Sequence, residues 1–225
     1  MPIHIKICGV SDKQTALSAA AAGADAVGLV FVEESPRVVT MTQARDVVQA
    51  LPVFVEPVGL FVDRPAEQVL ETAGELGLRT VQLHGGESPE YVADLTGLRV
   101  IKAIGFTDQA AAHAELQRWH SPPEQLAGLL FDAAPPLGSA TTGGNGLPPD
   151  WSAIAQLMHE SDALDHLPPV ILAGGLTPQN VGEAIRIVQP YAVDVSSGVE
   201  SSRGVKDLAL IAQFCAAVRA ASRAR

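Results

Sequence analysis

Residues 169–198 read PVILAGGLTPQNVGEAIRIVQPYAVDVSSG. Two short runs rich in Val, Ile and Ala, PVILAGG and YAVDVSS, stand on either side of a helical run, TPQNVGEAIRIV. A strand, a helix and a second strand in close succession are typical of a parallel sheet, because parallel strands need a crossover connection. This stretch therefore predicts a β–α–β unit.

The same alternation runs through the whole chain. The last helical run, residues 206–221, has its apolar residues at the i, i+3, i+4 spacing of an amphipathic helix. Eight strand–helix pairs in 225 residues predict a single (β/α)8 TIM barrel that occupies residues 1–225 as one α/β domain. The alternative is an open doubly wound sheet, but its usual dinucleotide-binding glycine pattern is absent. The predicted strands are residues 4–8, 26–31, 55–61, 80–85, 99–105, 128–133, 169–175 and 191–197.

Local signals predict where helices begin and where the longest loop lies. Ser11, Ser88 and Thr177 are expected to cap helix N-termini, the last two with a proline directly after them. Residues 133–150, rich in Gly, Pro, Ser and Thr, form a long loop after the sixth strand. Long loops inside compact domains are usually functional, and the strand–helix alternation resumes afterwards. We therefore expect a binding loop here and not a domain boundary.

Composition narrows the classes of partner. The chain is 47% hydrophobic and 18% charged, with a formal net charge of -10. This acidic balance argues against nucleic acid or an anionic membrane as a partner, because both would be repelled. Two cysteines do not make a disulfide framework, and no run is long and apolar enough to cross a bilayer. No leader-like segment opens the sequence, so a cytoplasmic location is expected.

The carboxyl ends of the strands should carry the chemistry, because active sites of such barrels lie there. The last two strands end in glycines and serines. Backbone N–H groups at such loops and helix N-termini bind phosphate without a lysine, and these two loops are the usual phosphate grip of barrel enzymes. A phosphosugar substrate is therefore expected, bound in part by Gly174, Gly175, Ser196 and Ser197. The alternative is that the glycines only permit a tight turn.

Two titratable residues at strand ends are candidates for proton transfer. Cys8 ends the first strand, and Lys6 should point into the barrel one layer below it. A buried lysine needs an anionic partner, and Asp194 on the adjoining eighth strand is the candidate. This positive neighbourhood is expected to favour the thiolate of Cys8. Asp132 ends an apolar strand across the barrel, so base and acid would flank a central ligand.

Structural explanations for these residues stay open. Cys8 could be a small buried hydrophobe, and Asp132 could cap a helix or bond its own loop. Arg37, after the second strand, could hold a carboxylate through two bonds or could be a solvated surface residue. No hydrolase triad and no zinc-type spacing of Cys and His is evident, so no metal site is predicted.

Eight motifs in order along the chain resemble the phosphoribosylanthranilate isomerase family. Each alone is weakly specific, but the combination is highly specific and covers nearly the whole chain. The motifs are KICG at 6–9, SPR at 35–37, VQLHGGE at 81–87, LLFD at 129–132, GGNG at 143–146, DW at 150–151, LAGGLTPQNV at 172–181 and VDVSSGVE at 193–200.

The resemblance implies a (β/α)8 barrel that isomerises N-(5′-phosphoribosyl)anthranilate in tryptophan biosynthesis by an Amadori rearrangement. It implies a small phosphoribosyl substrate and no metal or organic cofactor. It implies that Cys8 is the general base, Asp132 the general acid and Arg37 the residue on the anthranilate side. His84 and Asp194 match positions that line the family's pocket. The implied phosphate ligands are Gly144, Gly174, Gly175, Ser196 and Ser197.

Two other functions compete with this interpretation. A different phosphosugar enzyme, such as a metal-dependent epimerase, would need His and Asp ligands on several strands, and only His84 ends a strand here. A non-catalytic phosphoribosyl-binding protein would be expected to lack the acid or the base, yet both residues are present. The sequence carries no signal for the oligomeric state.

Overall fold

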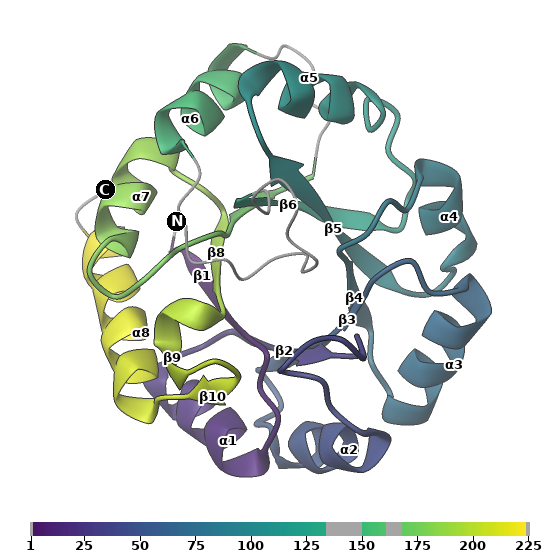
Figure 1. Ribbon diagram of the computed structural model, residues 1–225, viewed down its shortest axis with the longest axis vertical. Helices are drawn as coiled ribbons and strands as arrows, with labels where there is room; N and C mark the ends of the chain where they lie inside the picture. The colour runs from purple at the N-terminus through teal and green to yellow at the C-terminus, as the bar shows by residue number, and fades with distance from the viewer. Residues whose placement is uncertain (1, 134–149, 161–167, 224–225) are drawn as a thin grey trace.

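A computed structural model describes residues 2–133, 150–160 and 168–223. Within these residues the strands β1 to β8 form a closed parallel barrel in chain order, and helices surround it (Figure 1). The predicted (β/α)8 architecture is therefore confirmed. The strands are β1 (His4–Cys8), β2 (Ala26–Val30), β3 (Glu56–Phe61), β4 (Thr80–Leu83), β5 (Arg99–Phe106), β6 (Leu126–Ala133), β7 (Val170–Leu172) and β8 (Ala192–Val195). The helices are α1 (Lys13–Ala22), α2 (Met41–Ala50), α3 (Ala66–Leu76), α4 (Pro89–Asp94), α5 (Gln109–Gln117), α6 (Trp151–Glu160), α7 (Val181–Val188) and α8 (Leu208–Arg223).

The alternation of side chains along β1 separates two cores. Ile5 and Ile7 belong to the large apolar core between the barrel and its helices. Lys6 and Cys8, at the alternate positions, therefore point to the barrel interior. A smaller apolar cluster belongs to β5, β6, β7 and β8, formed by Ala103, Leu130, Ile171, Ala173 and Ala192. The interior is thus filled by side chains and leaves room for polar groups only at particular layers.

The barrel closes where the two ends of the chain meet. Strand β1 pairs with β8 so that Lys6 lies opposite Asp194. Helix α8 secures this seam through Arg219, which donates to the carbonyl oxygens of Ile3 at 2.8 Å and Gly23 at 2.7 Å and to Asp25 Oδ2 at 3.1 Å. One guanidinium therefore ties the last helix to the start of β1 and to the end of α1.

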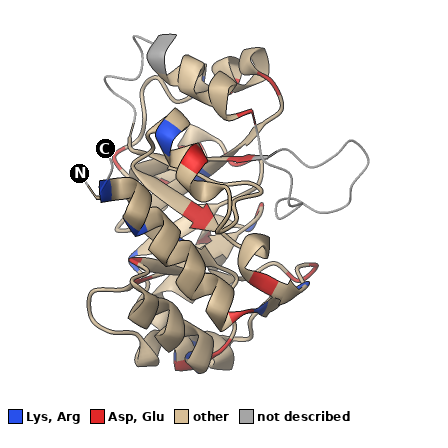
Figure 2. Cartoon of the chain, turned by 90° about the vertical axis from the view of Figure 1, so that its left-hand side faces the viewer, with Lys and Arg blue, Asp and Glu red and all other residues tan. Residues whose placement is uncertain are grey.

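Charged side chains are sparse on the side of the barrel formed by α7 and α8. Helix α8 is sixteen residues long and carries only Arg219 and Arg223 as charged residues, and the cartoon on this side of the barrel is largely tan in Figure 2. Its buried residues include Ile211 and Phe214, which pack against the barrel. Despite this apolar character, no helix in the described part of the chain has the length and hydropathy needed to cross a membrane.

A short hairpin follows β8 and has no counterpart in a minimal barrel. A 3-10 helix, η2 (Ser197–Val199), leads into β9 (Glu200–Ser202) and β10 (Val205–Lys206), which pair antiparallel. The sequence pattern did not predict this hairpin, because two strands of two or three residues are too short to show periodicity. The 3-10 helix that leads into it contacts α8, and the hairpin brings two charged residues, Glu200 and Lys206, to the site described below.

Of the three predicted helix caps, one is confirmed and two are wrong. Ser88 caps α4, with Pro89 as the first helical residue. Helix α1 is capped by Asp12, not Ser11, because the Asp12 carboxylate accepts bonds from both the backbone and the hydroxyl of Thr15. Helix α7 begins only at Val181, since residues 177–180 form a turn that precedes it.

Arg219→Ala should lower the free energy of unfolding by about 2 kcal/mol, because two carbonyl groups lose a charged donor. Urea denaturation monitored by circular dichroism measures this change. The matched control is Arg223→Ala on the same helix, whose exposed side chain should alter stability by no more than about 0.5 kcal/mol. Equal losses in the two variants would contradict the proposed role of Arg219 at the seam.

Candidate active site

A pocket at the carboxyl ends of the strands brings together most of the residues singled out from the sequence. Polar groups from β1, β4, β6 and β8 face one another across it, and apolar residues of β2 and β3 form one wall. It is lined by Cys8, Val30, Val32, Ser35, Arg37, Leu60, Val62, Gln82, His84, Asp132, Asp194 and Ser196. The prediction that Cys8 and Asp132 flank one cavity therefore agrees with the geometry.

On one side of this pocket a buried ion pair lies beneath the thiol. Lys6 Nζ donates to Asp194 Oδ1 at 2.9 Å, and both side chains are buried. The expected pairing of Lys6 with Asp194 is thus present. Gly28 on β2 makes room for it, because a Cβ there would lie 2.8 Å from Cys8 Sγ and 3.3 Å from Lys6 Nζ. A side chain at position 28 would displace the thiol or the ammonium group.

Burial and the charge of Lys6 act in opposite directions on the Cys8 thiol. Burial raises the pKa of the Cys8 thiol, and the charge of Lys6 opposes this only in part. Burial alone would lower the pKa of Lys6, but the charges of Asp194 and Cys8 and the hydrogen bonds to them together outweigh it, and the pKa of Lys6 is raised. The expected influence of Lys6 in favour of the thiolate is therefore present, but burial outweighs it and the pKa of Cys8 is raised overall.

On the other side of the pocket Asp132 is held by a histidine. Asp132 is 7% exposed, and its Oδ2 lies 3.3 Å from His84 Nε2. The other ring nitrogen, Nδ1, lies 3.0 Å from Nε2 of Gln82, which precedes His84 by two residues and lies in β4. A chain of three polar side chains thus runs from the barrel interior to the candidate acid.

Arg37 reaches the pocket but is held by an acidic residue of the hairpin. Its Nε and Nη2 donate to the two carboxylate oxygens of Glu200 at 2.6 and 3.0 Å. Glu200 also accepts from Lys206 Nζ at 2.7 Å. Burial alone would raise the pKa of Glu200, but the bonds from Arg37 and the charge of Lys206 lower it to about 2. Arg37 is therefore a fixed residue of the site and not a solvated surface residue.

The loops after β7 and β8 form one continuous unit. Gly174 and Gly175 adopt left-handed conformations, at φ 84° and 61°, that side chains rarely adopt. Ser196 accepts at its carbonyl and its hydroxyl from Lys206 Nζ, at 2.9 and 3.2 Å. A Cβ at Gly198 would overlap the carbonyl oxygen of Leu176, so the two loops touch at this point.

The other predicted phosphate ligands are Ser197 and Gly144, of which the structure describes only Ser197. Ser197 begins the 3-10 helix η2 and lies beside the Gly198 contact. Asn180 joins the β7 loop to the start of α7, because its side chain accepts from the Thr177 amide at 2.7 Å and donates to the Gly175 carbonyl at 2.9 Å. Gly144 lies outside the described residues.

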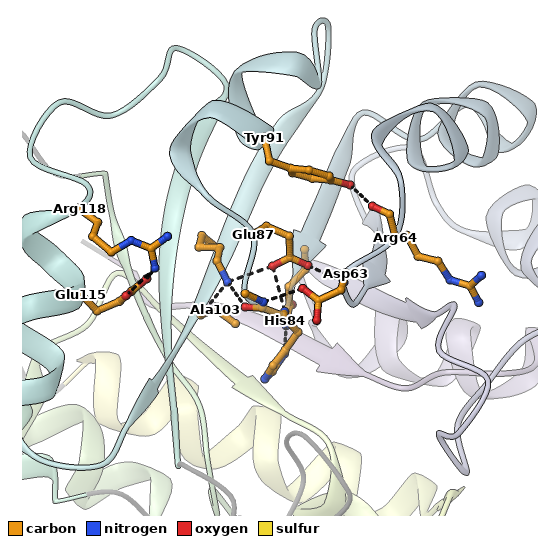
Figure 3. A network of polar contacts seen from close by, with 12 residues as sticks. Asp63, Arg64, His84, Glu87, Tyr91, Ala103, Glu115 and Arg118 are labelled. Carbon is orange, nitrogen blue, oxygen red and sulfur yellow. Dashed lines mark hydrogen bonds and ion pairs between the residues drawn. The ribbon is translucent and has the colours of Figure 1, made fainter.

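A buried network fixes the loop that carries His84. Glu87 accepts from the amides of Asp63 at 2.9 Å and Gly85 at 3.0 Å. Its carboxylate also lies 3.1 Å from Lys102 Nζ, with both side chains 2% exposed. Figure 3 shows Asp63, His84 and Glu87 gathered where the loops after β3 and β4 meet. The position of the His84 backbone is therefore determined by contacts to two neighbouring strands.

A larger cavity of about 430 Å³ lies at the opposite, N-terminal mouth of the barrel. Its two carboxylates are already bonded, since Asp25 accepts from the Ile5 amide at 2.8 Å and Glu56 accepts from Thr80 Oγ1 at 2.8 Å. Barrel enzymes place their reactive groups at the carboxyl ends of the strands. The smaller pocket with Cys8 and Asp132 is thus the candidate active site. Among the described residues, no three His, Cys, Asp or Glu side chains converge as metal ligands.

Three polar residues of the pocket region were missed from the sequence. Glu200 and Lys206 lie on the unpredicted hairpin, and Gln82 lies inside β4. The only signals were that Gln82 falls in the VQLHGGE motif and Glu200 in the VDVSSGVE motif, and neither motif indicated a role for these two residues.

Comparison with known proteins shows the family of the chain. Residues 5–217 match the family described as N-(5'phosphoribosyl)anthranilate (PRA) isomerase. The chain belongs to the phosphoribosylanthranilate isomerase family. The expected function, an isomerase of tryptophan biosynthesis, is confirmed at this level.

Individual relatives cover nearly the full chain. The N-(5'-phosphoribosyl)anthranilate isomerase of Geobacter metallireducens is 44% identical over 212 residues, 94% of this chain and 96% of its own length. The Thermotoga maritima phosphoribosyl anthranilate isomerase structure is 36% identical with a TM-score of 0.82, covering 97% of this chain and 99% of that one. A family structure in complex with reduced 1-(o-carboxyphenylamino)-1-deoxyribulose 5-phosphate is 34% identical with a TM-score of 0.81, at the same coverage.

In this isomerase-family chain, Glu200→Gln should lower the free energy of unfolding by about 3 kcal/mol at neutral pH, because Arg37 and Lys206 lose their buried counter-charge. The pKa of Glu200 is about 2 in the folded chain, against about 4.3 when unfolded. The stabilisation is therefore complete above about pH 4.3 and is lost as the pH falls towards 2. Urea melts at several pH values should show the two proteins converging in acid.

The matched control is Glu183→Gln, which breaks an exposed pair with Arg186 and should cost at most about 1 kcal/mol. If Glu200→Gln lost no more stability than Glu183→Gln at neutral pH, the ion-pair interpretation would be wrong.

Proposed function

We propose that the chain converts N-(5′-phosphoribosyl)anthranilate to 1-(2-carboxyphenylamino)-1-deoxyribulose 5-phosphate, with Asp132 as general acid and Cys8 as general base. The observation that carries the proposal is that these two residues, from β6 and β1, line one pocket in a chain of this family. An acid and a base on different strands can act on opposite sides of one bound sugar.

The reaction begins with opening of the ribose ring. Asp132 donates its proton to the ring oxygen as the C1′–O bond breaks, and the nitrogen lone pair forms a protonated imine with C1′. This cationic imine withdraws electrons and acidifies the proton on C2′. Cys8, as the thiolate, then removes that proton and the electron pair neutralises the imine as an enolamine. Collapse of the enol to a ketone gives the product. The substrate supplies its own electron sink.

The thiolate must be formed in the site, because burial raises the pKa of Cys8. Lys6 and Lys206 both favour the charged form, and Lys6 also bonds the sulfur. Asp194 has the opposite effect, so its pairing with Lys6 limits how much thiolate is present. We propose that Asp194 holds Lys6 below the sulfur and that Asp194 and His84, which both line the pocket, also bind the substrate.

The rest of the pocket suits the two anionic ends of the substrate. Of the five N–H donors of an arginine, Arg37 uses two on Glu200, and the others are proposed to bind the anthranilate carboxylate. Glycine lets a ligand approach the backbone closely. The phosphate is proposed to bind the loops after β6, β7 and β8, namely at Gly144, Gly174, Gly175, Ser196 and Ser197.

Residues 1–225 are proposed to form one catalytic domain. A cytoplasmic location is supported by two cysteines that are both free thiols. The proposed partner is the small phosphoribosyl substrate, and no cofactor takes part in the steps above.

Asp132→Asn should reduce kcat by about 10²- to 10⁴-fold, because an amide cannot protonate the ring oxygen. Loss of the fluorescence of the anthranilate substrate measures turnover without added metal. Affinity for reduced 1-(o-carboxyphenylamino)-1-deoxyribulose 5-phosphate should change little, which isothermal titration checks. Near-native turnover in this variant would overturn the assignment of the acid.

The kcat/KM of the wild type should rise with pH between about 6 and 9, because the thiolate fraction of Cys8 grows as the pH approaches its raised pKa. Cys8→Ser should be slower by about 10²-fold or more and should lack this rise, because a serine hydroxyl does not ionise in that range. A wild-type profile that is flat or falls across the whole range would contradict Cys8 as the base.

A further inference from the structure

His84 lies between two side chains, each of which contacts one of its two ring nitrogens. Its Nδ1 is 3.0 Å from Nε2 of Gln82, and its Nε2 is 3.3 Å from Asp132 Oδ2. Gln82 is 0% exposed, so its amide is removed from water. The three side chains form a row that ends on the proposed acid.

An amide nitrogen can only donate a hydrogen bond, so it pairs with a ring nitrogen that carries a lone pair. With Gln82 Nε2 against Nδ1, a neutral His84 carries its proton on Nε2. That proton points to Asp132 Oδ2. When Asp132 is protonated, Oδ2 is then occupied as an acceptor and the carboxyl proton must reside on Oδ1.

The opposite amide orientation is less favourable here. Gln82 Oε1 is buried with no hydrogen-bond partner among the described residues. Turning the amide over would bond Oε1 to His84 but would leave both N–H donors of Gln82 without that partner. It would also require the ring proton on Nδ1, which would leave the lone pair of Nε2 facing an oxygen that can only accept whenever Asp132 is ionised.

Hydrogen bonds fix the backbone at His84, which limits how far the ring can move away from Gln82 and Asp132. The His84 amide donates to the Phe61 carbonyl at 2.9 Å, and the next residue, Gly85, is bonded to Glu87 at 3.0 Å. The other charged or titratable groups of the pocket are Cys8 and Arg37, with Asp194 paired to Lys6. Among the residues that the structure describes, the polar contacts of the imidazole are to Gln82 and Asp132 and not to these groups.

We propose that Gln82 is a positioning residue that selects the Nε2–H tautomer of His84 and thereby keeps the transferable proton of Asp132 on Oδ1. The proposal rests on Asp132 being the general acid. In the other tautomer, His84 Nε2 would accept the Asp132 proton, and the acid would point to the histidine instead of the sugar.

The test combines NMR of the ring nitrogens with kinetics. Two-bond ¹H–¹⁵N correlation spectra of labelled wild-type protein, with His84 assigned by a His84→Asn variant, should show Nδ1 unprotonated and Nε2 protonated. Gln82→Glu offers only an acceptor, so Nδ1 should become protonated. Its kcat should fall by about 10²-fold with little change in KM. Gln82→Met, which offers neither donor nor acceptor, should mix the tautomers and reduce kcat by about tenfold.

The matched control is Thr80→Val, another buried polar residue of β4, which bonds Glu56 and not the pocket. It should leave kcat and the His84 spectrum unchanged. A wild-type His84 protonated at Nδ1, or Gln82 variants with the kcat of Thr80→Val, would overturn the proposal. The wild-type spectrum needs no turnover and stays informative if Gln82→Glu fails to fold. A wild type that folds but lacks isomerase activity would contradict the proposed function alone.

Discussion

The buried pair of Lys6 and Asp194 is the interaction on which the rest of the site depends. It joins β1 to β8, the two strands whose pairing closes the barrel, at 2.9 Å and out of contact with water. Either charge alone would be too costly at this depth, so the pair exists only when the barrel is closed. Cys8 lies directly above it, in contact with Gly28. Closure of the barrel therefore also assembles the charged groups that surround the Cys8 thiol.

A second ionic cluster, formed by Arg37, Glu200 and Lys206, gives this acidic chain a positively charged region beside the pocket. The formal net charge is -10, yet Arg37 and Lys206 both converge on Glu200 beside the pocket. Glu200 carries one negative charge against two positive charges, so the cluster keeps a local excess of one positive charge. Burial lowers the pKa of Lys206 although Glu200 opposes this, which shows how tightly the group is enclosed. The overall charge of a protein therefore says little about the potential inside one cavity.

The fold and the central residues could be predicted because they follow from two simple periodicities. Strand alternation places Lys6 below Cys8, and chain order in a closed barrel places Asp194 beside them. Glu200 could not be found this way, because its contact joins residues 163 positions apart through a hairpin too short to leave a pattern. Gln82 looks like an ordinary strand residue until its neighbours are known. The influence of Lys6 on Cys8 could be predicted, but the net rise in the pKa of the thiol could not, because burial, its largest cause, is a property of three-dimensional packing.

The contact of Gly198 with the Leu176 carbonyl links the loops after β7 and β8 into one body. A shift of either loop must move the other, since no side chain separates them to absorb the displacement. Adapting this end of the barrel to a larger or smaller anion would thus require compensating substitutions in both loops together. Evolutionary change there is constrained to correlated steps, because a side chain added at position 198 would overlap the backbone of the other loop.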